Sequence, residues 1–449
     1  MKVRYRYLVR RRLFLIIISL LGISIYAVAE ILKDVARKDR LNLDEKCFSI
    51  GTNYEYNPIV EKQIPIVASY PMPSGKLPTV EAFNEIKECG FNLISYAVSS
   101  AYVDRVIEVA KESGTSLLIR SGVLLTNRGG DFVNKYRDCP NILGWYVKDE
   151  PQFSELDSIL YYYDVIMKSC PEKLTYINLI GSRVEKFTGP NFGYGQYLEL
   201  IQKKFKPAVW CYDFYPISEE NNKIKVAYNN FYSDLELYAR ISSLTKRPFW
   251  AYCQCMEFKN KKVYRPAPTV PFLRFEAFSA LAYGAQGIVY WAYAQQKSLK
   301  EDSFLSAPID MNGKKTKAWY AVQSVNQEIK AYSEVFLNSE VIDCQHTGNL
   351  DLKNVKIYQG NFGPIKTIKT EEMGVLLAHL KNTGGEYLVI VNHDVNNLQC
   401  IELELSLGLR GEQLLFSDDK ETITSNGELY SSWRLSLSPG GYSVIKLIF

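Results

Sequence analysis

The 449-residue chain has a formal net charge of +4, with 47% hydrophobic and 23% charged residues. These values are typical of an ordinary globular protein, and the length predicts one large domain with a smaller one. Six basic residues and no acidic one lie in the first twelve positions, so the remainder is close to neutral. The charge therefore gives no support for a nucleic-acid-binding protein.

The basic start leads into an apolar segment, Leu13 to Ala29, which ends in Ala27-Val28-Ala29. Basic, apolar and small-residue parts in this order are typical of a secretory signal peptide, and the run is short for a membrane span. We expect residues 1–29 to be a cleaved signal, so that the protein is exported to the periplasm, the cell surface or the medium. A retained N-terminal membrane anchor is the alternative. Residues 30–63 then form a polar N-terminal extension.

The nine cysteines are odd in number and spread along the chain, and no two of them form a CxxC pair. This spacing indicates neither a disulfide framework nor a zinc site. Most of them are therefore expected to be buried free thiols.

From residue 64 onward, eight short apolar runs alternate with amphipathic stretches that have a helical pattern. The expected strands are residues 64–70, 91–98, 115–122, 142–150, 174–180, 208–216, 248–255 and 287–293, and the eighth helix is 317–337. Eight such units in succession predict an α/β fold, a (β/α)8 TIM barrel over residues 64–338. A doubly wound open sheet is the alternative, but no glycine-rich phosphate loop follows any of the strands.

Beyond the barrel the pattern changes to strand-like runs separated by turn clusters that contain glycine. These runs include residues 374–380, 386–393, 401–407 and 442–449. They predict a small antiparallel β-sandwich domain over residues 339–449. We expect this sandwich to pack on the barrel and stabilise it, and a separate binding module is the alternative.

The working residues of such a barrel lie at the C-terminal ends of its strands. The polar and aromatic residues at these ends are Tyr70, Tyr96, Arg120, Asp149, Glu150, Asn178, Asp213, Tyr215, Gln254, Glu257 and Trp291. All three histidines fall in the sandwich region, which argues against a Ser-His-Asp triad, a histidine-bound metal or a histidine base in the barrel. Carboxylate chemistry remains, as in glycosidic cleavage, which uses one acid to protonate the leaving oxygen and a second carboxylate.

Asp149 and Glu150 lie in the segment "GWYVKDEPQ", after an aromatic strand and directly before Pro151. Acidic residues before a proline are also typical of a helix N-terminus, where they cap the helix and favour its dipole. The two interpretations are compatible, because helix N-termini begin at the barrel mouth.

The segment "GWYVKDEP" resembles the fourth strand of exported clan-A (β/α)8 glycoside hydrolases, the superfamily of β-galactosidases and cellulases. In these enzymes the Glu of an Asn-Glu-Pro or Asp-Glu-Pro motif is the general acid/base. Further segments that resemble the superfamily are "YDFYPI" (212–217), "RPFWAYCQC" (247–255), "LAYGAQGIVYWAY" (281–293), residues 310–329, "YLVIVNHD" and "PGGYSVIKL". The resemblance spans roughly residues 64–449 and implies a carbohydrate substrate with no cofactor and no metal.

The resemblance implies that Glu150 is the general acid/base and that Asp149 holds a sugar hydroxyl. Asp213 and Tyr215 would flank the sugar, and Trp291 would form a stacking floor. The other expected substrate-binding residues at the strand ends are Tyr70, Arg120, Asn178 and Gln254.

The sequence departs from the resemblance on the seventh strand. Retaining members carry a nucleophilic Glu about six residues after a proline like Pro248, and Gln254 stands there in this chain. Three hypotheses follow. Glu257 in the next loop acts as nucleophile or base, or the enzyme inverts with Asp213 or Asp149 activating water across from Glu150. In the third, the barrel binds a glycan without cleaving it, and this non-catalytic binder is the alternative to the glycoside hydrolase.

Overall fold

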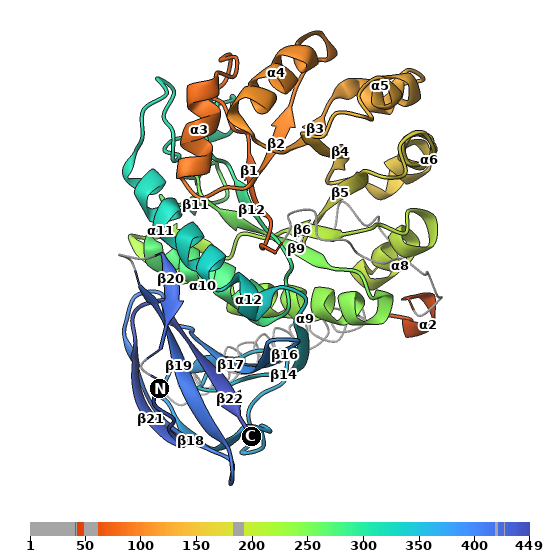
Figure 1. The fold of residues 1–449 in the computed structure, drawn as a ribbon. Helices are drawn as coiled ribbons and strands as arrows, with labels where there is room; N and C mark the ends of the chain where they lie inside the picture. The colour runs from red at the N-terminus through yellow and green to blue at the C-terminus, as the bar shows by residue number, and fades with distance from the viewer. Residues whose placement is uncertain (1–40, 42, 49–61, 183–192, 418–420, 426) are drawn as a thin grey trace, which may run out of the picture.

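The computed structural model describes residues 41, 43–48, 62–182, 193–417, 421–425 and 427–449. A closed barrel of eight parallel strands is followed by antiparallel sheets (Figure 1), which confirms the predicted TIM barrel and β-sandwich. Residues 1–29, expected to be a signal peptide, lie outside the described residues, as does most of the predicted extension. Within the described ranges, no helix combines the length and the apolar character needed to cross a membrane.

The barrel strands follow the eight predicted apolar runs, with one to three residues trimmed from most ends. They are β1 (Ile66–Ser69), β2 (Leu93–Ala97), β3 (Leu117–Arg120), β4 (Ile142–Asp149), β5 (Leu174–Ile180), β6 (Trp210–Asp213), β9 (Phe249–Gln254) and β12 (Ile288–Trp291). The barrel closes between β1 and β12, where Val67 pairs with Val289. Because all strands are parallel, their C-terminal ends open at one mouth.

Helices surround the barrel, and their ends agree with the local sequence. The main ones are α3 (Val80–Glu88), α4 (Val103–Ser113), α5 (Gly129–Lys135), α6 (Leu156–Ser169), α8 (Tyr194–Lys204), α9 (Tyr228–Thr245), α10 (Val270–Ala282) and α11 (Lys317–Ala331). Gly114 ends α4 at a φ of 65°, a conformation that favours glycine. The predicted helix 317–337 is broken at Tyr332 into α11 and α12 (Ser333–Phe336). The Tyr332 hydroxyl donates to the Leu414 carbonyl of the sandwich at 2.9 Å.

Two small sheets that the sequence did not predict stand among the loops at the barrel mouth. A hairpin joins β7 (Ile217–Glu220) to β8 (Lys223–Val226). A second sheet, here called the flap sheet, pairs β10 (Phe258–Lys259) with β11 (Tyr264–Arg265) and β13 (Ser303–Phe304). The flap sheet ties the loop after β9 to the loop after β12, and each of its strands is too short to give a periodic signal.

The sandwich consists of two antiparallel sheets with an apolar core between them. One sheet contains β14 (Glu340–His346), β16 (Val375–Asn382), β17 (Gly385–Asn392), β22 (Tyr442–Ile448), β19 (Arg410–Ser417) and β20 (Thr422–Thr424); the other contains β15 (Ile365–Lys369), β18 (Gln399–Leu405) and β21 (Ser432–Leu437). Helix α10 packs against the first sheet (Figure 1), where the rings of Phe278 and Tyr442 stack with their centroids 3.5 Å apart. The predicted packing on the barrel is therefore present, and its stabilising effect stays a prediction.

Candidate active site

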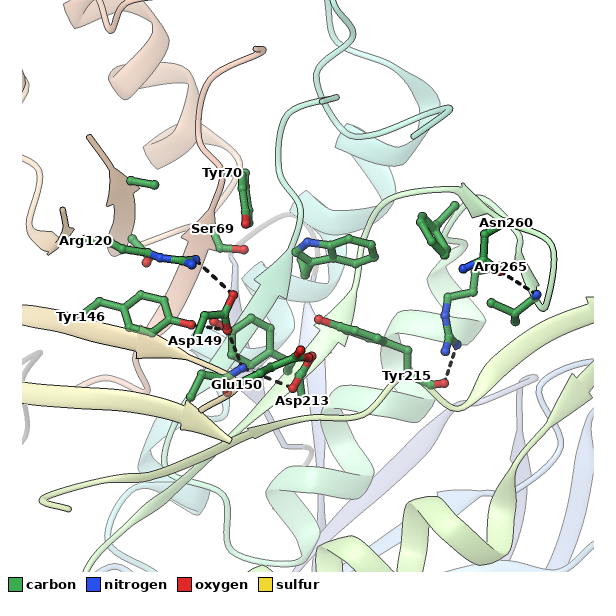
Figure 2. A pocket seen from close by; sticks show the side chains of 17 residues that line it. Ser69, Tyr70, Arg120, Tyr146, Asp149, Glu150, Asp213, Tyr215, Asn260 and Arg265 are labelled. Atoms are coloured by element: carbon green, nitrogen blue, oxygen red, sulfur yellow. Dashed lines mark hydrogen bonds and ion pairs between the residues drawn. The ribbon is translucent and has the colours of Figure 1, made fainter. Parts of the chain in front are cut away.

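A pocket of about 360 Å³ opens at the C-terminal ends of the barrel strands. The predicted residues that line it are Tyr70, Arg120, Asp149, Glu150, Asn178, Asp213, Tyr215 and Trp291. They come from six different strand ends, and Figure 2 shows Asp149, Glu150 and Asp213 close together. The barrel thus brings three carboxyl groups to one place, as expected from its geometry.

The pleat of β4 decides which aromatic ring faces the pocket. Successive side chains of a strand point to opposite faces. Tyr146 lines the pocket, whereas Trp145 is fully buried on the outer side against Phe132, with ring centroids 5.9 Å apart. This agrees with the alternation of the strand.

Two residues that line the pocket adopt a left-handed backbone conformation, Tyr70 with a φ of 48° and Glu150 with a φ of 45°. This conformation costs a residue other than glycine about 1 kcal/mol. The Glu150 N–H donates to the Asn178 carbonyl at 2.9 Å, which holds the turn against β5. The backbone is thus strained where the chain leaves β1 and β4 and enters the pocket.

The Asp149 carboxylate is held by three donors. The Tyr146 hydroxyl donates to Oδ1 at 2.6 Å, the Asn178 side-chain amide donates to the same oxygen at 3.1 Å, and Arg120 forms an ion pair with Oδ2 at 3.1 Å. Arg120 also lies over the Tyr146 ring, 5.1 Å from its centroid. Because a carboxylate with these partners is fixed in place, Asp149 is a rigid acceptor at the pocket wall.

The carboxyl groups of Glu150 and Asp213 lie close together in the pocket (Figure 2) and are called here the Glu150–Asp213 pair. Desolvation raises the pKa of Asp213 well above its usual range, and the charges of Glu150 and Asp149 raise it further. The amide of Asn178, which donates to Asp213 Oδ1 at 3.3 Å, acts in the opposite direction. Two neighbouring carboxyl groups resist ionising together, so the pair favours a state in which it holds one proton.

The spacing of this pair has a consequence for catalysis. Acid and nucleophile of retaining glycosidases are about 5–5.5 Å apart, and acid and base of inverting enzymes about 6.5–9.5 Å. The separation that Glu150 and Asp213 adopt around a bound sugar would therefore decide between the two mechanisms.

An apolar wall faces the carboxylates. The rings of Tyr215 and Trp291 lie with centroids 5.3 Å apart, and Phe258 of the flap sheet meets Trp291 at 5.7 Å. Arg265 lies over the Tyr215 ring and donates to the Tyr215 and Ile217 carbonyls, which ties the flap sheet to the loop after β6.

Strand alternation predicts that one of the two rings Trp145 and Tyr146 faces the pocket, and Tyr146 does. The sequence reasoning missed several other residues that line the pocket, namely Ser69, Ser95, Ala97, Tyr252, Phe258, Asn260, Val263 and Arg265. Strand alternation was also the signal available for Tyr252, whereas no periodic signal marked Phe258, Asn260, Val263 and Arg265, which belong to the flap sheet and its turn.

Gln254 and Glu257 are not among the residues that line the pocket. The Gln254 amide donates to the Met256 carbonyl at 3.0 Å and to the Pro266 carbonyl at 3.1 Å. The Glu257 carboxylate accepts from the Tyr264 hydroxyl at 2.7 Å within the flap sheet. Neither side chain is therefore brought to the three carboxyl groups. The remaining strand-end residue of the initial set, Tyr96, packs outward against Phe83.

We expect Gln254→Glu to destabilise the fold without increasing turnover. The new carboxylate would replace an amide donor that faces two carbonyl oxygens, and an unsatisfied buried group of this kind costs about 1–3 kcal/mol. Urea unfolding and glycoside turnover measure the two effects, with Gln254→Met as the uncharged control. A tenfold gain in turnover for Gln254→Glu would instead identify this position as a vacant nucleophile site.

Residues 163–332, from α6 to the end of the barrel, match the family model described as Glyco_hydro_42: Beta-galactosidase. No curated protein matches the sequence at a significant level. The match falls on the half of the barrel that contributes Asp213, Tyr215 and Trp291 to the pocket. The matched segment makes up less than half of the chain.

Solved structures share the fold at low sequence identity. A catalytic mutant of Gan42B, a GH42 β-galactosidase from G. stearothermophilus, aligns with a TM-score of 0.59 and 10% identity, over 88% of this chain and 100% of that one. A β-galactosidase from Bacillus circulans sp. alkalophilus aligns with a TM-score of 0.59 and 10% sequence identity, over 87% of this chain and 100% of that one. A β-galactosidase from the psychrophilic Marinomonas ef1 aligns with a TM-score of 0.45 and 10% sequence identity, over 61% of this chain. The alignment covers 60% of the Marinomonas chain, so this protein spans less than two thirds of that chain's length.

Proposed function

We propose that the protein cleaves a glycosidic bond of an oligo- or polysaccharide, with Glu150 as the general acid/base. The observation that carries this proposal is the gathering of Asp149, Glu150 and Asp213 in one pocket at the barrel mouth (Figure 2). Glycosidic cleavage needs an acid that still holds its proton near neutral pH. The pair supplies it, because desolvation and the charges of Glu150 and Asp149 raise the pKa of Asp213 and so keep one proton on the two carboxyl groups.

In the proposed reaction the sugar enters between the pair and the aromatic wall. Glu150 gives the shared proton to the leaving oxygen as the bond to the anomeric carbon breaks. Asp213, left ionised, faces the positive charge that develops on the sugar ring. A water molecule then adds to the anomeric carbon and returns one proton to the pair, so that the site regains its starting state.

The pocket also offers groups that suit a sugar. The rings of Tyr215 and Trp291, tilted by 31° to one another, form an aromatic surface for the apolar face of a pyranose. The fixed carboxylate of Asp149 lies beside Glu150, where it would accept from a hydroxyl. The family description and the similar structures named above are β-galactosidases, so galactosides are the first substrates to try.

We further propose that this reaction takes place outside the cytoplasm. The support is the N-terminal sequence, in which basic residues are followed by the apolar segment Leu13 to Ala29, and this segment ends in small residues. Mass spectrometry of the mature N-terminus from the natural host would show whether the chain is cut near Ala29. An intact apolar segment in a membrane fraction would instead support an anchor.

The test of the proposed activity is release of reducing ends from a panel of galactosides and of plant and host glycans by the purified protein. We expect release from at least one member of the panel. Calorimetric titration with the same glycans is the parallel measurement. Tight binding of a glycan with no release of any would favour the non-catalytic glycan-binding barrel.

A further inference from the structure

Asn178 occupies a central position among the acidic residues of the pocket. It lies on β5, directly beside Asp149 of β4 in the strand register, and only 1% of it is exposed. Its backbone carbonyl accepts from the Glu150 N–H at 2.9 Å. Its side-chain nitrogen donates to Asp149 Oδ1 at 3.1 Å and to Asp213 Oδ1 at 3.3 Å. One residue thus contacts all three acidic residues of the site.

The hydrogen-bonding capacity of this amide explains the arrangement. A side-chain amide has two N–H groups, and here each one faces a different carboxyl group. The amide oxygen is buried and has no hydrogen-bond partner among the residues that the structure describes. Both donors are therefore already used by the protein, which leaves none for a sugar hydroxyl.

We propose that Asn178 is a positioning residue that holds Asp149 and Asp213 apart and sets how readily the Glu150–Asp213 pair takes up a proton. This inference rests on the proposed function, and it replaces the expectation that Asn178 binds the sugar. Its physical basis is that hydrogen bonds donated to a carboxylate favour the charged form. Without them, the charges of Asp149 and Glu150 would act on Asp213 with no amide of Asn178 to offset them.

The direction of the effect follows from the same contacts. Desolvation already raises the pKa of Asp213, and the Asn178 amide lowers it in part. Removal of the amide therefore raises this pKa further. A group whose pKa is raised in the folded state stabilises the fold at low pH, and that contribution is lost as the pH rises through the folded pKa. Removal of the amide should thus steepen the loss of stability toward high pH.

Asn178→Leu is the variant that tests this, because leucine has a similar size and no donor. In the pH profile of kcat/KM, one limb reflects the ionisation of the Glu150–Asp213 pair. We expect this limb to move to a higher pH by about one unit. We also expect the fall in unfolding free energy between pH 5 and pH 9 to become larger than in the parent protein. Asn178→Ser, which keeps a single short donor, is the second variant in case Asn178→Leu does not fold, and it should show a smaller shift.

Asn326→Leu is the matched control. Asn326 is also a buried asparagine whose amide donates to a backbone carbonyl, that of Cys89 at 2.9 Å. Its amide oxygen likewise finds no partner in the described part of the chain, but the residue lies on α11 away from the pocket. We expect this control to lose stability equally at all pH values, with unchanged limbs in the rate profile. If the Asn178 variants behave in the same way, Asn178 has only a structural role and the inference fails.

The stability measurement also separates this inference from the proposed function. Unfolding as a function of pH requires no substrate, so a steeper dependence in Asn178→Leu supports the positioning role even if no glycan is cleaved. An unchanged dependence overturns it even if the parent protein is an active glycosidase.

Discussion

Replacing Glu150 by Gln is expected to lower turnover of a glycoside with a poor leaving group by about 10²–10⁴-fold. The amide keeps the size of the side chain and removes its proton exchange with Asp213. Protonation of the leaving oxygen matters most when that oxygen is a sugar hydroxyl. The loss should therefore be much smaller for an aryl glycoside whose phenol leaves without help.

This prediction is checked by kcat on a matched pair of substrates, one with a sugar and one with a nitrophenol as the leaving group. Glu257→Gln is the matched control, because Glu257 bonds to Tyr264 and does not line the pocket. A large loss in Glu257→Gln, with Glu150→Gln close to the parent, would move the acid role away from Glu150. It would also favour the hypothesis that the loop after the seventh barrel strand moves into the site.

Asp213→Asn should give a protein that is nearly inactive but more stable at alkaline pH. The raised pKa of Asp213 means that keeping it ionised opposes folding. Each unit of this shift costs about 1.4 kcal/mol once the pH exceeds the folded pKa. Asparagine removes this cost, and it also removes the group that shares a proton with Glu150.

Urea unfolding near pH 6 and pH 9 measures the stability effect, since the gain should grow with pH. Asp157→Asn is a suitable control, because Asp157 forms an exposed ion pair with Lys204 on the outer surface of the barrel. A variant of Asp213 that is destabilised equally at both pH values would show that the carboxylate is well accommodated in its charged form. The assignment of a raised pKa to Asp213 would then be wrong.

The barrel could be predicted because its signal is repeated eight times. Each buried strand is a short apolar run, and capping positions such as Gly114 mark where helices end. The carboxylates of Asp149, Glu150 and Asp213 could be placed together for the same reason, since parallel strands end at one mouth. Their contact with one another could not be predicted, because it depends on the left-handed turn at Glu150.

The flap sheet shows the limit of sequence reasoning most clearly. Its strands have two residues each, and the contact of Arg265 with the loop after β6 joins positions about fifty residues apart. Gln254 gives a second example. Its sequence position suggested a hydroxyl-binding role, whereas its amide is occupied by the carbonyls of Met256 and Pro266. Hydrogen-bond partners of this kind depend on how loops return, which no local pattern encodes.

The measurement that tests the central claim most directly is reducing-end release from one natural glycan by the parent protein and by Glu150→Gln, together with calorimetric binding of that glycan to both. We expect the parent to release sugar, and the variant to bind the glycan with similar affinity and release little or none. Equal release by the two proteins would contradict the role of Glu150 as the acid. Binding by both with release by neither would contradict the claim that this pocket is catalytic.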